Sequence, residues 1–333
     1  MEAVVARVTT IRPLAAADLE AVVSLDAALE GRARSEYFAR RLASALREPA
    51  RHVQLAADDH AGLAGFVLAR TLHGEFGRTR PVLRLEAIGV RADAKGAGIG
   101  ARLFDALLDW SKRHGVEELR TQAAWNRHAM LRWLDEVGFA MASASVVERT
   151  VGEIEGEPLD DADGEPAFEI DYGSRADHRH ARLERDRFDV RTMQAEDVDA
   201  IVRIDRAHTG RARADYIGSR LAETLADSAI GVSITARVDG AIVGFLLART
   251  DLGAFGRLEP VAVIDTIGVD PAYMRHGVGR ALLSQLMVNL AALRIERVET
   301  VVAPRNLGLL GFLYAAGFGP SQRLPFVRRV QRS

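Results

Sequence analysis

An internal repeat is the feature of this chain that most limits its fold. A shift of about 179 positions places residues 11–139 on residues 190–318 without a gap, with roughly a third of the positions identical. The stretch FVLART at 66–71 then lies on FLLART at 245–250, and GEFGR at 74–78 lies on GAFGR at 253–257. Each copy has the size of an ordinary domain, so the sequence predicts two complete domains rather than a solenoid.

The segment between the copies differs from both in composition. Residues 152–171 are rich in Glu and Asp and contain no Lys or Arg, whereas residues 174–187 are rich in Arg. Such blocks of charge are typical of a solvated linker, either a plain spacer or a segment whose acidic part folds back on a basic surface. We therefore expect a first domain over 1–151, a charged linker over 152–187 and a second domain over 188–333.

Composition narrows the function classes. The chain has 333 residues, 48% hydrophobic and 27% charged, as in soluble globular proteins. Its formal net charge of -2 gives no general attraction to nucleic acid or to an acidic membrane. The lack of cysteine excludes disulfides, thiolate metal sites and cysteine nucleophiles, and the histidines show no metal-ligand spacing. Without a signal-like leader or a stretch of membrane-spanning length, a cytoplasmic location is expected.

Both copies predict the same order of elements. A first strand near 11–12 and 190–191 is followed by two helices, a hairpin, a long central strand, a helix, a further strand, a short helix and a last strand. The helices are expected at 17–29, 35–47 and 101–114, and at 196–207, 214–227 and 280–293. The hairpin, central and following strands are expected at 52–57, 65–71, 82–90 and 118–124, and at 231–238, 244–250, 261–269 and 297–303. This order predicts a partly parallel sheet in each copy.

A glycine-rich turn precedes the third helix of each copy, as KGAGIG at 95–100 and MRHGVG at 274–279. A helix N-terminus leaves backbone N–H groups unpaired, and glycines let that backbone approach a diphosphate. The alternative is a tight turn that merely requires glycine. A dinucleotide fingerprint would need a third glycine where Ala101 and Arg280 stand, and no Gly-Lys-Ser/Thr of a P-loop is present.

In this context the chain resembles the GNAT superfamily of N-acetyltransferases. The resemblance covers both copies nearly end to end, including the Gly-Phe that ends the short helix at 138–139 and 317–318. The family's signature, Arg/Gln-x-x-Gly-x-Gly/Ala, is met in the first copy by Lys95, Gly98 and Gly100. The second copy keeps Gly277 and Gly279 but has Met274 in place of the basic residue. The resemblance implies an α/β (α+β) fold with two tandem domains, each a mixed, partly parallel twisted sheet flanked by helices.

The resemblance also implies acetyl-CoA as co-substrate and no metal. The main chain near 88–90 and 267–269 would face the thioester, where an N–H stabilises the oxyanion formed when an amine attacks. In the first copy the implied cofactor-binding residues are Ile88, Gly89, Val90, Lys95, Gly96, Ala97, Gly98, Ile99, Gly100 and Ala101. In the second copy they are Ile267, Gly268, Val269, Arg275, His276, Gly277, Val278, Gly279 and Arg280.

Glu86 and Asp265 occupy equivalent positions in apolar central strands. Burial would raise their pKa values and make them candidate general bases; the alternative is a carboxylate paired with an arginine or bonded to backbone. The tyrosine that the family often uses as general acid is replaced by Leu134 and Leu313. Tyr314, about 100° further round a helix, is the remaining candidate for that role.

Gly-Arg-Ala-Arg segments between the first two helices are the candidate acceptor-binding elements. The residues are Arg32, Arg34 and Tyr37 in the first copy, and Arg211, Arg213 and Tyr216 in the second. Two arginines and a tyrosine could bind a carboxylate or phosphate of the acceptor. Alternatively the arginines pair with nearby acids and the tyrosines pack in the core. Phe-Gly pairs at 76–77 and 255–256 are expected to cover the same cleft.

The sequence thus predicts an acyltransferase that moves acetyl from acetyl-CoA to a primary amine by direct attack, with acetyl-CoA bound in both domains. The alternatives are a non-catalytic acyl-CoA-binding or regulatory module, and a chain with one catalytic domain. The acceptor is expected to be a small-molecule or peptide amine, with neither nucleic acid nor membrane as partner. The duplication allows an intramolecular pseudo-dimer.

Overall fold

The computed structural model describes residues 9–72, 81–152, 154, 188–226 and 232–330. The strands of the first copy are β1 (Thr10–Pro13), β2 (His52–Asp59), β3 (Gly62–Leu72), β4 (Val82–Val90), β5 (Glu118–Ala124), β6 (Ala140–Met141) and β7 (Ser145–Thr150). Its helices are α1 (Leu19–Glu30), α2 (Ser35–Arg47), α3 (Ile99–Arg113) and α4 (His128–Glu136).

The second copy repeats this order. Its strands are β8 (Asp189–Thr192), β9 (Ile234–Val238), β10 (Ala241–Asp251), β11 (Val261–Val269), β12 (Arg297–Val302), β13 (Gly319–Pro320) and β14 (Arg323–Arg329). Its helices are α6 (Val198–Thr209), α7 (Ala214–Ala226), α8 (Val278–Ala292) and α9 (Leu307–Ala315). The expected third helices begin slightly earlier than predicted, at Ile99 and Val278, because Gly98 and Gly277 serve as their N-caps.

Two mixed sheets of seven strands carry the fold, in the orders β1-β2-β3-β4-β5-β14-β6 and β13-β7-β12-β11-β10-β9-β8. The central pairs β4–β5 and β11–β12 are parallel, and the pairs of the β1–β4 and β8–β11 segments are antiparallel. This confirms the predicted fold class of two tandem domains with partly parallel sheets flanked by helices.

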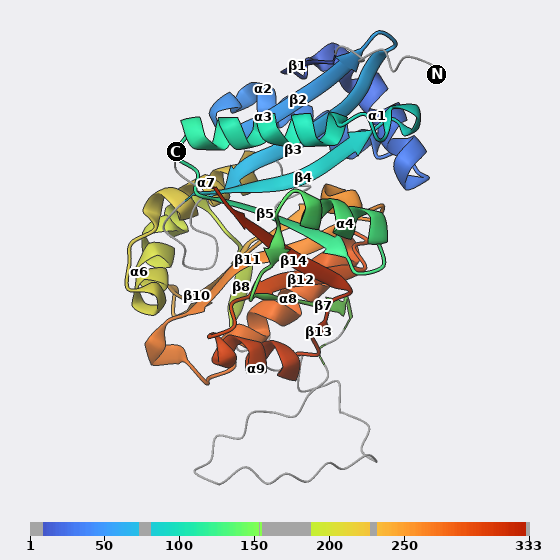
Figure 1. Cartoon of the computed structure of the whole chain (residues 1–333). Coiled ribbons are helices and arrows are strands. Elements are labelled where there is room, and N and C mark those ends of the chain that lie inside the picture. The colour runs from blue at the N-terminus through green and yellow to red at the C-terminus, as the bar shows by residue number, and fades with distance from the viewer. Residues whose placement is uncertain (1–8, 73–80, 153, 155–187, 227–231, 331–333) are drawn as a thin grey trace, which may run out of the picture.

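The last strand of each copy lies in the sheet of the other copy. β14 pairs with β5 and β6 of the first copy, and β7 pairs with β12 and β13 of the second. In Figure 1 the dark red β14 accordingly crosses to the green β5. Only residues 142–144 separate β6 from β7, and residues 321–322 separate β13 from β14. Each sheet is therefore built from both copies. The proposed boundaries at 151 and 188 divide the sequence by copy and do not anticipate this exchange.

Helices cover both faces of each sheet. In the first sheet Phe66 and Leu68 pack against α1 and α2, while their neighbours Val67 and Ala69 pack on the α3 side. This alternation is the period of two that a strand imposes on its side chains. On α3 the buried residues Ile99, Leu103 and Leu107 recur every four positions, so one helix face is apolar.

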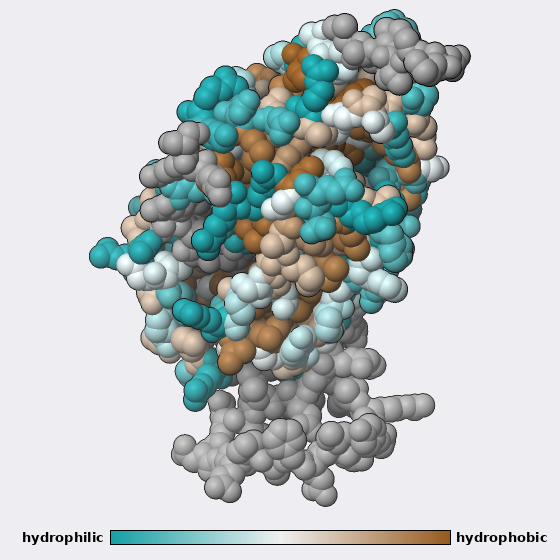
Figure 2. Space-filling model, in the orientation of Figure 1, coloured by the Kyte–Doolittle hydropathy of each residue, from teal (hydrophilic) through white to brown (hydrophobic). Residues whose placement is uncertain are grey.

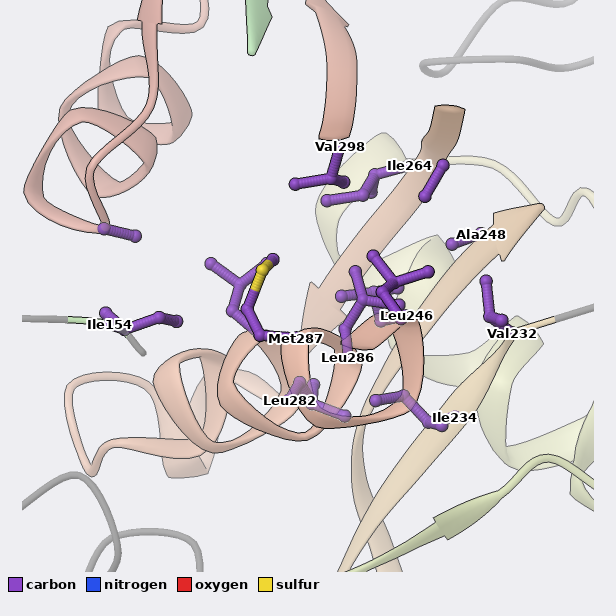
Figure 3. Packing of buried hydrophobic residues seen from close by; sticks show 14 of the residues in the cluster. Ile154, Val232, Ile234, Leu246, Ala248, Ile264, Leu282, Leu286, Met287 and Val298 are labelled. Carbon is purple, nitrogen blue, oxygen red and sulfur yellow. The ribbon is translucent and has the colours of Figure 1, made fainter. Parts of the chain in front are cut away.

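The core of the second sheet is built in the same way. Figure 3 shows Leu282, Leu286 and Met287 of α8 directed toward side chains of the sheet, such as Leu246 and Ile264. Ile154, which follows β7 in the first copy's chain, is part of this cluster. The exchanged segment therefore contributes to the second core as well as to its sheet.

The surface carries apolar residues as well as charged ones. Figure 2 shows hydrophobic residues gathered along the middle and lower part of the visible face, framed by hydrophilic ones. Among the described helices, none is both long enough and apolar enough to traverse a lipid bilayer.

Candidate active site

A fork between two parallel strands forms the centre of each candidate site. β4 and β5 are paired only at Leu83–Leu119 and Arg84–Arg120, although β4 continues to Val90. Beyond this point the strands diverge, and the Thr121 hydroxyl donates to the Leu85 carbonyl at 2.9 Å. In the second copy β11 and β12 separate after Ile264, whose carbonyl accepts from the Thr300 hydroxyl at 2.9 Å.

A cleft of about 290 Å³ opens at each fork. The first cleft is lined by Leu85, Ile88, Ala124, Leu134 and others, and the second by Ile264, Ile267, Ala303, Leu313 and others. Strands that part in this way leave backbone groups facing the gap, where an extended ligand can pair with them as an added strand. Ile88 and Ile267, two of the residues predicted to face a thioester, therefore line the two clefts.

A β-bulge on the central strand shapes each fork. In the first sheet Leu68 pairs with Ala87 and Ala69 with Leu85, so Glu86 is the extra residue of β4. In the second sheet Leu247 pairs with Thr266 and Ala248 with Ile264, which leaves Asp265 as the extra residue of β11. A bulge bends its strand and increases its twist, so both acids lie where the central strand turns away from its parallel neighbour.

Glu86 is 3% exposed and lies in a cluster of arginines. Its carboxylate is 2.5 Å from Arg41 Nε, 2.8 Å from Arg70 Nε and 2.9 Å from Arg84 Nη2. Burial alone would raise the pKa of Glu86, but the three guanidinium groups outweigh it and hold the pKa far below the ordinary value. The expected rise in pKa is therefore wrong for Glu86, because sequence reasoning counted burial without the arginines.

Asp265 has a looser version of the same environment. It is 2% exposed, with Arg249 Nε at 3.2 Å and Arg220 Nη1 at 4.0 Å. Arg249 and Arg220 are the repeat equivalents of Arg70 and Arg41, whereas Val263 stands where the first copy has Arg84. The alternative of a carboxylate paired with arginine thus describes both acids.

The glycine-rich turns have the geometry of an anion cradle. Gly96 and Gly98 have φ of 82° and 75°, in the left-handed region that favours glycine. In the second copy Arg275 takes the place of Gly96 with φ 64°, and Gly277 has φ 85°. Neither Gly98 nor Gly277 is accompanied by a side-chain cap on its helix, so the first-turn N–H groups are available to an anion.

Several predicted cofactor-binding residues have a packing role. The side chains of Ile99 and Val278 are buried in the cores, so only their main chain can contact a cofactor. A Cβ on Gly89 would lie 2.7 Å from Phe66 Cε1, and one on Gly268 would lie 2.6 Å from Phe245 Cε1. The aromatic rings thus explain these two glycines sterically. Lys95, Ala97, Ala101 and His276 are exposed around the turns, and Arg280 is half-buried.

An aromatic residue beside each turn was missed by sequence reasoning. A Cβ on Gly100 would come within 3.3 Å of Trp133 Nε1, and one on Gly279 within 3.1 Å of Phe312 Cζ. Because these glycines have no side chains, α4 and α9 can pack against the N-terminal ends of α3 and α8. The repeat could have indicated these residues, because Trp133 and Phe312 are aromatic at equivalent positions, directly before Leu134 and Leu313.

The candidate acceptor-binding arginines divide into two kinds. Arg34 is buried and donates from Nε to Asp26 at 2.8 Å, and Arg213 donates in the same way to Asp205 at 2.8 Å. Their guanidinium groups lie over the rings of Tyr37 and Tyr216, which are also buried. Arg34 and Arg213 line the clefts with their charges already matched, so the alternative of pairing with nearby acids holds for them.

Arg32 and Arg211 are exposed. Neither is among the described residues that line a cleft. Tyr314 is likewise absent from the described lining of the second cleft and is 46% exposed, whereas the preceding Leu313 lines it. One position along a helix turns a side chain by about 100°, which explains why Tyr314 is directed elsewhere. The structure therefore does not bring Tyr314 to the fork.

Residues of the second copy enter the first cleft. Phe255, Gly256 and Arg323 line it together with Ile88 and Gln122. The Phe-Gly pair at 255–256 was expected to cover the cleft of its own copy, and it lies instead in the cleft of the other. The pair at 76–77 falls outside the described residues.

The second cleft has a different internal contact. His208, on α6, has Nε2 2.5 Å from the carbonyl oxygen of Val269, one of the main-chain groups predicted to face the thioester. Leu29 occupies the equivalent position in the first copy and offers no such contact. Within the described part of the chain, no group of three or more His, Asp or Glu residues is arranged to hold a metal ion.

Comparisons with known proteins agree with this geometry. The model of the acetyltransferase (GNAT) family matches residues 19–139 and 199–318. A tandem GNAT protein from the clavulanic acid biosynthesis pathway aligns over 98% of this chain and 100% of its own, with TM-score 0.62 and 18% identity. A GCN5-related N-acetyltransferase from Sphaerobacter thermophilus aligns over 97% and 96%, with TM-score 0.58 and 17% identity.

A third solved structure is much longer than this chain. It contains a glucosamine N-acetyltransferase region of a fungal multi-domain GH3 β-N-acetylglucosaminidase, and it aligns over 98% of this chain but only 39% of its own, with TM-score 0.63 and 13% identity. No curated protein matches the chain. Identities this low show a shared fold. Since the family model covers most of the sequence, in two copies that each form a fork beside a glycine-rich helix start, the chain belongs to the acetyltransferase (GNAT) family.

Proposed function

We propose that this protein transfers an acetyl group from acetyl-CoA to a primary amine, and that each copy contains a binding site for acetyl-CoA. The observation that carries the proposal is the repeated combination of a forked parallel strand pair and an uncapped, glycine-rich helix start. The fork supplies backbone groups at a strand edge for the extended thioester arm, and the helix start supplies N–H donors for a pyrophosphate.

The residues of the first copy suggest how the reaction would proceed. The turn at 95–100 binds the pyrophosphate, with Lys95 adding a positive charge at its exposed end. A main-chain N–H near Ile88–Val90 stabilises the oxyanion as the amine attacks the thioester carbonyl. The amine nitrogen forms the new bond to the acetyl carbon, and the carbon–sulfur bond breaks as CoA thiolate leaves. This direct route requires no covalent enzyme intermediate.

We assign Glu86 and Asp265 a positioning role in this scheme. Asp265 is assigned this role by its equivalent bulge position and its two arginines. Glu86, held by three guanidinium groups, is a weak base at neutral pH, because protonation would leave those cations unbalanced. Its ion pairs join β4 to α2 and β3, and so fix the bulge that opens the fork. The acceptor would then lose its proton to water or attack as the free amine already present.

The second copy is proposed to bind acetyl-CoA more weakly. Met274 replaces the basic signature residue, and His208 already contacts the Val269 carbonyl that a ligand in the fork would use. A second candidate function, catalysis in the first copy with binding alone in the second, rests on these two differences.

The proposal is tested by calorimetry with acetyl-CoA and by CoA-thiol release with a panel of amines. We expect two binding events, the second weaker. Gly98→Glu places a carboxylate in the cradle and should abolish the first event only, and Gly277→Glu the second only. Gly98→Ala and Gly277→Ala are the matched controls, because alanine bears the same positive-φ strain of roughly 1–2 kcal/mol without charge. Absence of binding in the folded wild type would refute the proposal.

A further inference from the structure

A loop of the second copy forms one wall of the first cleft. Its residues 253–256 follow β10, and the Asp251 carboxylate fixes them by accepting from the N–H groups of Gly253 at 3.1 Å and Ala254 at 2.8 Å. Arg34 of the first copy donates to the Gly253 carbonyl. A Cβ on Gly253 would lie 3.0 Å from Tyr37 Cγ, so the loop sits directly against α2.

Phe255 is held in this loop with φ 61°, an unusual backbone conformation for a residue with a side chain. Its ring lies near three guanidinium groups, with centroid distances of 5.5 Å to Arg84, 5.3 Å to Arg257 and 5.8 Å to Arg323. Strain of this kind persists where surrounding contacts fix it, and it is frequent at binding sites. The loop therefore presents a preformed aromatic wall to the cleft of the other copy.

Arg323 reaches the same cleft from the exchanged strand β14. It pairs in register with Ala124 at the open end of the fork, and its Nη2 donates to the Phe255 carbonyl at 2.7 Å. Its Nε is buried without a hydrogen-bond partner among the described residues. Burial and the neighbouring Arg257 lower the pKa of Arg323 to about 10, and the nearby carboxylates of Glu299, Asp251 and Glu148 offset this only in part.

The other charged residues that line this cleft all have an ionic partner. Glu30 accepts two bonds of 2.7 Å from Arg127, Arg34 is paired with Asp26, and Glu86 has its arginines. Positive charge therefore predominates around the cleft, and Arg323 brings a guanidinium to it whose Nε has no hydrogen-bond partner among the described residues. A buried cation gains most from a ligand that brings a matching anion.

We propose that the acceptor pocket of the first copy is completed by the second copy, and that Arg323 binds the carboxylate of an amine acceptor of the amino-acid type. This inference rests on the proposed acetyl transfer and names its substrate class. A planar carboxylate presents two oxygens that match the planar guanidinium fork of one arginine. The Nε and Nη1 groups remain as donors for it, and Phe255 packs against the rest of the acceptor.

The experiment is carried out in the full-length Gly277→Glu background, so that turnover reports the first site alone. Amino acids are compared with their amides, which keep the amine and lose the negative charge. We expect kcat/KM to favour the acids, and Arg323→Met to lower kcat/KM for acids about 10- to 100-fold, the usual range for a charge-assisted contact. The amides should change less than about threefold, and acetyl-CoA binding should be unchanged. Arg329→Met, an exposed arginine on the same strand, is the control.

Two additional variants test each part of the proposal. Arg323→Lys keeps the charge and should retain part of the preference for acids, which a purely structural role of Arg323 would not produce. Phe255→Ala changes only the second copy, yet it should raise KM for the acceptor at the first site. Equal losses with acids and amides, a preference for phosphoethanolamine, or an unchanged KM in Phe255→Ala would overturn the proposal.

Failure of the proposed acetyl transfer gives a different result. If no amine is acetylated, calorimetric binding of the amino acids in the presence of CoA still tests Arg323, because that readout needs no turnover. Binding of acids that is lost in Arg323→Met then supports the site. Binding that is equal in both proteins refutes it.

Discussion

Thr300 of the second copy lies opposite Val147 of the first copy in one antiparallel ladder. The reciprocal pair, Thr121 with Phe326, lies in the other sheet. Both threonines also bridge the forks through their hydroxyl groups. Each fork is therefore braced by a strand from the other copy, and neither site is independent of its partner.

This exchange predicts how the protein responds to cleavage within residues 155–187. A nick there leaves β7 and β14 in place, so the two fragments should elute together in native size-exclusion chromatography and separate only in denaturant. The matching fragments expressed alone, 1–151 and 188–333, should aggregate or expose unpaired strand edges. Fragments that part without denaturant, each with cooperative unfolding, would show that the exchange is dispensable.

Glu86→Gln should lower the free energy of unfolding markedly and have only a small effect on the rate of acetyl transfer. Removing the charge leaves three buried guanidinium groups under-compensated, and breaking a buried pair costs about 3–5 kcal/mol. Denaturant unfolding measures this loss, and Glu36→Gln, at an exposed i,i+4 pair with Arg40, should cost about 0–1 kcal/mol. The opposite pattern would restore Glu86 as general base: unchanged stability with a loss of two to four powers of ten in rate that shrinks at high pH.

His52 should make the protein less stable as the pH falls from about 6.5 to about 4. Burial, with Arg41 nearby, lowers its pKa from 6.5 to about 4, so the folded state binds fewer protons than the unfolded chain in this window. Stability therefore rises with pH across it and is lost on acidification. The slope of Tm against pH should be smaller in His52→Gln, with His60→Gln in the exposed β2–β3 turn as control. Equal slopes in the two variants would contradict this assignment.

His208→Ala should strengthen acetyl-CoA binding at the second site. The substitution frees the Val269 carbonyl from its contact with Nε2, so a ligand no longer has to displace that hydrogen bond. A net hydrogen bond of about 0.5–1.5 kcal/mol corresponds to roughly 2- to 12-fold in affinity. Calorimetry in the Gly98→Glu background isolates this event, and His60→Ala is the control. A weaker second site would show that His208 assists binding.

Local sequence determined much of the fold. The patterns of 82–90 and of 101–114 predicted the central strand and the following helix, and the glycine-rich turn marked the helix start to within two residues. These patterns depend on residues a few positions apart, which share a face of one element. The repeat itself then predicted two similar sheets and two equivalent sites.

Only the tertiary structure decided which copy each last strand joins. Residues 145–150 and 323–329 have the alternation of a strand, but backbone pairing is similar in either sheet, so the partner depends on the whole arrangement of the chain. The same holds for Glu86, because its pKa depends on Arg41 and Arg70, which lie far away in sequence. Arg323 is likewise brought to the first cleft by the strand exchange alone. Charges and pockets that depend on distant contacts cannot be derived from local pattern.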